Sequence, residues 1–84
     1  MLISFDPQAK ALYIQIKEAK VKRTVEFAPE TFIDLDSSGD LIGVEMLHPG
    51  TLTITILKKI GSEYNTPKLK RVRLDDIPRA FARA

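Results

Sequence analysis

The stretch TFIDLDSSGDLIGVEML, residues 31–47, decides the fold. Two apolar segments, TFIDL and LIGVEML, lie on either side of DSSGD. Asp and Ser side chains bond to the nearby backbone in tight turns, and Gly tolerates the left-handed torsions that such turns need. The stretch therefore predicts two antiparallel strands joined by a hairpin turn.

The same residues also fit the calcium loop of an EF-hand. Counting from Asp34, the matching positions are the first, third, fifth, sixth and twelfth, held by Asp34, Asp36, Ser38, Gly39 and Glu45. An EF-hand loop lies between two helices, whereas the flanks here alternate with period two. Strand pairing would also carry Glu45 along the sheet, away from Asp34 and Asp36, so the hairpin is the favoured interpretation.

The rest of the first half alternates in the same way, which is typical of strands with one buried face. In ALYIQIK, the residues Leu12, Ile14 and Ile16 share one face. LISF precedes it across the turn sequence DPQAK, and VKRTVEF follows after the polar KEAK. Residues 1–47 are therefore expected to form about five strands.

The segment LIGVEML, residues 41–47, is apolar on both faces. Such a strand is either central in the sheet and covered twice, or part of an interface. We therefore take Leu41, Val44 and Leu47 as candidates for contacts with a partner.

Residues 51–64, TLTITILKKIGSEY, fit two patterns. Alternation with threonine suggests a strand through Leu52, Ile54 and Ile56, and a four-residue spacing suggests a helix through Leu52, Ile56, Ile60 and Tyr64. We expect the helix, capped by Thr51 or Thr53, because its spacing covers the whole segment. The strand remains the alternative.

The last residues are expected to add a short extended piece, LKRVRL, and a terminal helix in DDIPRAFARA. Asp75 or Asp76 would cap that helix, and Ile77 with Phe81 would dock it. The fold class is α+β in a single domain, residues 1–84, with an antiparallel β-meander in residues 1–47. One or two helices from residues 51–84 would pack on one face of that sheet.

Charge is divided unevenly along the 84 residues, although the net charge is only +2. Residues 1–50 hold five Lys and Arg against eight Asp and Glu, and residues 51–84 hold eight against three. Such asymmetry suggests a nucleic-acid or acidic partner. The candidate phosphate contacts are Lys58, Lys59, Lys68, Lys70, Arg71 and Arg73.

Catalytic and metal-binding patterns are sparse. The chain has no cysteine and one histidine, His48, and its four serines lie in no Gly-x-Ser-x-Gly elbow. Asp34, Asp36 and Asp40 are the only candidates for a cation site. We therefore expect a protein that is not an enzyme and needs no cofactor.

The location and assembly follow from size and hydropathy. MLISFDPQAK lacks the basic start and long apolar run of a secretory signal, and no run approaches the about 18 residues of a membrane span. A cytoplasmic protein is expected. A chain this short has a thin core, so a homodimer is also expected.

The motifs FDPQAKALYIQI, TVEF and IDLDSSGDLIGVEML resemble the small prokaryotic family named domain of unknown function 2283, over about the first 47 residues. The resemblance implies a compact β-meander and no established activity. Gln8 and Lys10 stand where that family commonly places acids.

Three functions are therefore kept as hypotheses. The first is a non-catalytic binding or regulatory module that acts as a homodimer through protein–protein contacts. The second is a nucleic-acid-binding accessory protein that uses the basic second half of the chain. The third is a calcium site at the hairpin of residues 34–40.

Overall fold

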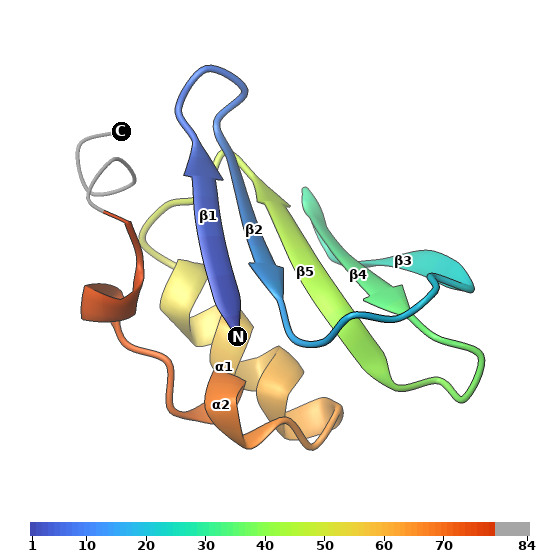
Figure 1. Cartoon of the computed structure of the whole chain (residues 1–84). Helices are drawn as coiled ribbons and strands as arrows, with labels where there is room; N and C mark the ends of the chain where they lie inside the picture. The colour runs from blue at the N-terminus through green and yellow to red at the C-terminus, as the bar shows by residue number, and fades with distance from the viewer. Residues whose placement is uncertain (79–84) are drawn as a thin grey trace.

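The computed structural model describes residues 1–78, which form one five-stranded antiparallel sheet with helices on one face (Figure 1). The strands are β1 (Leu2–Asp6), β2 (Ala11–Gln15), β3 (Arg23–Ala28), β4 (Thr31–Leu35) and β5 (Leu41–Leu47). They are followed by α1 (Thr53–Glu63), the short helix α2 (Pro67–Lys70) and a 3₁₀ turn, η1 (Leu74–Asp76). The predicted α+β class, with strands first and helices afterwards, is confirmed.

The strand order is β1-β2-β5-β4-β3, so β5 lies at the centre of the sheet. Both β2 and β4 pair with it in antiparallel register, and residues 16–22 carry the chain from β2 to β3 at the far edge. A central strand has hydrogen-bonded neighbours along both edges, and Leu41, Val44 and Met46 of this strand belong to the core.

The predicted hairpin joins β4 to β5. The Asp36 amide donates to the Asp40 carbonyl at 3.0 Å, and the Gly39 amide donates to the Asp36 carbonyl at 3.0 Å. Gly39 has φ +85°, a left-handed torsion that glycine adopts without steric cost. Local turn chemistry therefore fixes this connection.

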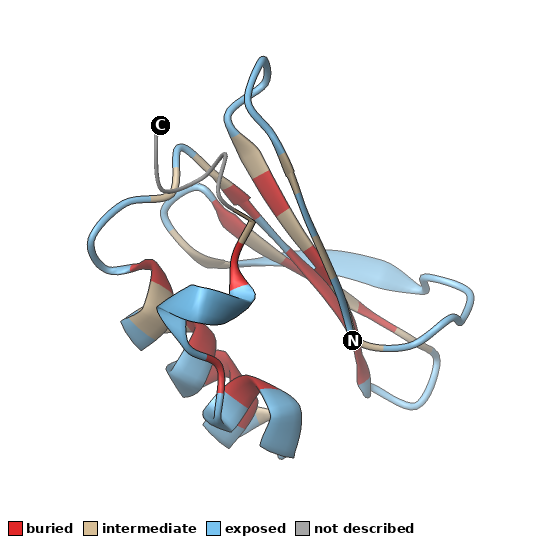
Figure 2. Cartoon of the chain, turned by 60° about the vertical axis from the view of Figure 1, so that its left-hand side comes forward, coloured by how far each residue is buried: buried red, intermediate tan, exposed pale blue. Residues whose placement is uncertain are grey.

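The core lies between the sheet and the helices (Figure 2). The sheet contributes Leu12, Ile14, Ile33, Leu35, Leu41, Val44 and Met46 to this core, and the second half contributes Leu57, Ile60, Leu69, Val72 and Ile77. No helix in residues 1–78 is long and apolar enough to span a membrane.

Residues 53–63 of the ambiguous segment are helical, as expected, but the predicted threonine cap is wrong. Leu52 occupies the N-cap position, is 65% exposed and gives no side-chain cap. The Thr53 hydroxyl instead accepts a hydrogen bond from the Gly50 amide at 2.9 Å. The buried stripe runs through Leu57 and Ile60, so Leu52 lies outside it.

The end of α1 is a Schellman motif. Asn65 adopts φ 49°, the Thr66 amide donates to the Gly61 carbonyl at 2.7 Å, and the Asn65 amide donates to Ser62 at 3.4 Å. Pro67 then begins α2, where its fixed φ and missing amide hydrogen are tolerated.

Two expectations for the last residues need correction. The predicted extended piece is wrong over residues 69–70, because these residues end α2, which places Leu69 in the core. In the predicted terminal helix, residues 74–76 form a 3₁₀ turn, and Ile77 is buried in extended conformation. Asp76 accepts a hydrogen bond from the Arg73 amide at 2.9 Å. The rest of that predicted helix, including Phe81, lies outside the described residues.

Candidate functional site

The sheet face turned away from the helices is a distinct surface. Strand register and period-two alternation place thirteen residues on it: Leu2, Ser4, Asp6, Ala11, Tyr13, Gln15, Thr24, Glu26, Phe32, Asp34, Gly43, Glu45 and Leu47. We call this surface the open sheet face. Asp34, Glu45 and Glu26 make it acidic, since it carries no Lys or Arg.

Tyr13 and Asp34 meet at the centre of the open sheet face. The Tyr13 hydroxyl donates to Asp34 Oδ2 at 3.4 Å, and the Thr24 hydroxyl donates to Asp34 Oδ1 at 2.6 Å. Burial, followed by the nearby charge of Asp34, raises the pKa of Tyr13. The phenol therefore stays protonated at neutral pH and satisfies the carboxylate.

The three interface candidates differ in accessibility. Leu41 and Val44 are 4% and 1% exposed and lie in the core, so neither offers surface to a partner. Leu47 is half-buried. Burial in the core thus accounts for Leu41 and Val44 without a partner. Two open sheet faces packed together would also bring like charges close, which disfavours a homodimer of that geometry.

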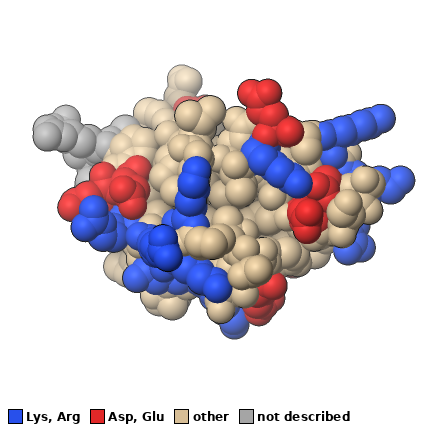
Figure 3. All heavy atoms as spheres, turned by 60° about the horizontal axis from the view of Figure 1, so that its bottom comes forward, with Lys and Arg blue, Asp and Glu red and all other residues tan. Residues whose placement is uncertain are grey.

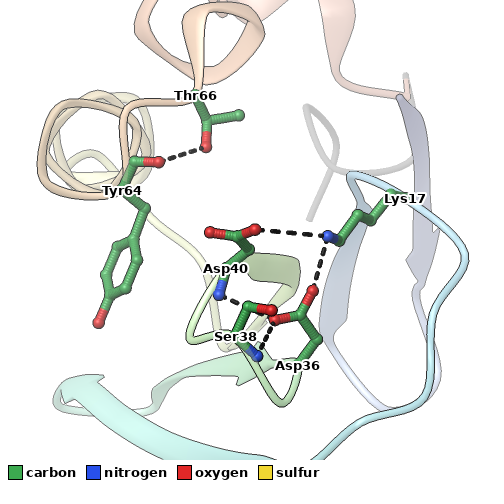
Figure 4. A network of polar contacts seen from close by, with 6 residues as sticks. All are labelled: Lys17, Asp36, Ser38, Asp40, Tyr64 and Thr66. Carbon is green, nitrogen blue, oxygen red and sulfur yellow. Dashed lines mark hydrogen bonds and ion pairs between the residues drawn. The ribbon is translucent and has the colours of Figure 1, made fainter.

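The three candidate cation ligands do not converge. Asp34 is held by Thr24 on the open sheet face, whereas the Lys17 ammonium lies 2.6 Å from Asp36 Oδ2 and 3.9 Å from Asp40 Oδ2 (Figure 4). Glu45 lies opposite Phe32 on the sheet. Within residues 1–78, no group of three or more His, Asp and Glu side chains is arranged to hold a metal ion. This geometry gives the calcium hypothesis no support.

The Asp36 carboxylate instead stabilises the hairpin. Its Oδ1 accepts hydrogen bonds from the Ser38 amide at 2.8 Å and the Asp40 amide at 3.0 Å. The hydrogen bond from Lys17, followed by that from the Asp40 amide, lowers the pKa of Asp36. Sequence reasoning missed the Lys17 contact, because nothing in KEAK marks a partner nineteen residues further along the chain.

We expect Asp36→Asn to reduce the free energy of unfolding at neutral pH, because it removes the ion pair while keeping an acceptor for the two amides. A carboxylate whose pKa is lowered by folding contributes stability above its ordinary pKa of 3.8 and loses that contribution as pH falls. The difference from the parent should therefore shrink below that pH. Urea denaturation at neutral and acidic pH measures it, and a pH-independent difference would contradict the ion-pair explanation.

His48 is exposed, and its Nδ1 lies 2.8 Å from Glu30 Oε2. The two side chains form an ion pair when the imidazole is protonated.

The six basic candidates lie on α1, on α2 and in the residues that follow. All six are exposed, and none forms an ion pair with a carboxylate of residues 1–78. Figure 3 shows Lys and Arg side chains gathered on the side of the molecule that carries the helices. We call Lys58, Lys59, Lys68, Lys70, Arg71 and Arg73 the basic helical surface.

A groove of 670 Å³ adjoins this surface. One wall is the turn between α1 and α2, with Tyr64, Asn65, Lys68 and Arg71, and the other includes Ile16 and Asp40 from the end of the sheet. We call it the α1–α2 groove. Sequence reasoning missed it, because the helical spacing placed Tyr64 in the buried stripe, whereas its side chain is half-buried and lines the groove.

These features define a small α+β domain in which an antiparallel sheet has one face covered by short helices and the other uncovered by them. The chain belongs to the family described as protein of unknown function (DUF2283), whose model matches residues 2–48. The match spans β1 to β5 and ends before α1. No curated protein and no solved structure matches the chain.

Proposed function

We propose that the protein is a non-catalytic binding module that holds nucleic acid on its basic helical surface. The observation that carries the proposal is the position of six exposed cations together on α1, on α2 and in the residues that follow, none of them with a carboxylate partner in residues 1–78. Cations that are not neutralised within the protein are free to replace the counterions of a phosphate backbone, and the release of those counterions drives binding.

The separation of the polar groups supports the proposal that this binding module is not catalytic. Catalysis needs a nucleophile, a base and an orienting group within hydrogen-bond reach of one another. His48 contacts Glu30 and Asp36 contacts Lys17, each in a separate place. Asp34 accepts hydrogen bonds from Thr24 and Tyr13, so its carboxylate already has partners from two other strands. These contacts support local structure rather than a catalytic role.

The proposal concerns this chain rather than its family, because the basic helical surface begins beyond residue 48, where the family match ends. Contacts with a protein partner and a homodimer remain predictions. Light scattering across a range of concentrations tests the dimer.

We expect salt-sensitive binding to a fluorescently labelled duplex, measured by anisotropy. If four of the six cations contact phosphates, the slope of log K against log salt is about −3.6, so each doubling of salt weakens binding about 12-fold. Changing Lys58, Lys59, Lys68 and Arg71 together to Gln should abolish most of this slope.

The matched control changes Lys10, Lys20, Lys22 and Arg23 to Gln, which removes the same number of exposed Lys and Arg charges away from the basic helical surface. Binding that responds equally to both sets would show that net charge, not this surface, governs affinity. Absence of binding at low salt would overturn the proposed function.

A further inference from the structure

We propose that the α1–α2 groove holds one unpaired nucleotide, with its base stacked on Tyr64 and its phosphates beside Lys68 and Arg71. This inference rests on the proposed function and adds the class of nucleic acid, namely single strands. It follows from four observations on the groove: its size, its aromatic side chain, the fixed turn that carries this side chain, and the opposite charges of its two walls.

The volume of 670 Å³ lies within the about 300–1,000 Å³ typical of small-ligand sites. Tyr64 gives the groove an aromatic ring, and Ile16 adds apolar surface. A base can stack on such a ring only when it has left its own helix, because paired bases already stack on each other. The groove therefore suits an unpaired base rather than a duplex.

The turn holds Tyr64 in place before any ligand arrives. Its backbone amide donates to the Ile60 carbonyl at 2.9 Å, and the Thr66 hydroxyl donates to the Tyr64 carbonyl at 3.2 Å. Figure 4 shows Tyr64 and Thr66 on the helical side of the groove and the Asp40 hairpin on the other side. The side chain of Tyr64 also packs against the core, so the ring loses little conformational freedom when it binds.

The charges of the two walls set the direction of the nucleotide. Lys68 and Arg71 lie on the helical wall and suit phosphate oxygens. Asp40 lies across from them, with a side chain that is 72% exposed. Its carboxylate repels phosphate and accepts hydrogen bonds from an amino group such as N4 of cytosine. The base therefore points toward Asp40, and cytosine is favoured over thymine, which presents an acceptor at that position.

The test compares Tyr64→Leu with Tyr64→Phe, using anisotropy of labelled oligo-deoxycytidine and of a labelled duplex. Leucine keeps apolar contact with the core but removes the ring, so we expect single-strand affinity to fall about 5- to 150-fold. Phenylalanine keeps the ring and should retain that affinity. Duplex affinity should be the same in all three proteins, and thermal unfolding confirms that each is folded.

Two results overturn the inference alone. One is duplex binding that persists while Tyr64→Leu leaves single-strand affinity unchanged, and the other is an equal loss on single strand and duplex. Equal affinity for oligo-deoxycytidine and oligo-deoxythymidine, unaltered by Asp40→Ala, overturns the assigned direction of the base. Absence of binding to either nucleic acid overturns the proposed function as well, so the two failures are distinguishable.

Discussion

Replacing Leu57 by alanine should lower the free energy of unfolding by about 2–5 kcal/mol. Leu57 is 0% exposed and lies where α1 meets the sheet. Its truncation removes apolar contacts and leaves a cavity that the rigid sheet cannot fill. A domain of this size is stabilised by only about 5–15 kcal/mol, so the variant loses a large part of its stability. Urea denaturation followed by circular dichroism measures the loss.

Leu52→Ala is the matched control, because it makes the same change at a position that is 65% exposed. We expect a loss within about 0.5 kcal/mol, as for other surface substitutions. A strand through residues 52–56 would instead place Leu52 on the same face as Ile54 and Ile56. Comparable losses in the two leucine variants would therefore contradict the position of α1.

The parts of the fold that depend on neighbouring residues could be predicted from the sequence. The β4–β5 hairpin was predictable because Asp36 and Gly39 close it through bonds within five residues. The helix in residues 53–63 was predictable from a four-residue spacing, yet its first turn was not, because the spacing includes Leu52 although the core does not. The sequence left open whether β5 is central in the sheet or part of an interface, since packing across the whole sheet places it between β2 and β4.

In the candidate site, too, the features that depend on neighbouring residues could be predicted and those that depend on tertiary structure could not. Exposed lysines and arginines follow from composition and polarity, and the basic residues are exposed as expected. The α1–α2 groove joins residues near 16, 40 and 64–71, so only the tertiary structure brings its walls together. The acidic pattern of an EF-hand loop does not form a calcium site here, because the tertiary structure gives its carboxylates different partners. The strand holds Asp34 against Thr24, whereas the turn directs Asp36 to Lys17.

Gly61→Val should be strongly destabilising, although the position is helical. A Cβ atom on Gly61 would lie 2.7 Å from the Lys70 amide nitrogen and 2.8 Å from Leu69 Cβ. Replacing a helical glycine by alanine gains about 1 kcal/mol of helix propensity, whereas overpacking costs about 1–3 kcal/mol and occasionally more. The cost of overpacking exceeds the gain in helix propensity here, because the Lys70 amide nitrogen belongs to the backbone and cannot rotate aside. We expect a small net loss for Gly61→Ala and about 3 kcal/mol or more for Gly61→Val.

Gly50→Val is the matched control for this prediction, because no heavy atom lies within 4 Å of a Cβ built on Gly50. Its unfolding midpoint in urea should stay close to that of the parent. The Gly61 variants should also weaken oligo-deoxycytidine binding, since moving α2 away from α1 shifts Lys68 and Arg71 relative to Tyr64. If Gly61→Val unfolds like the parent, the two helices do not pack at this glycine, and the groove that depends on their contact loses its physical basis.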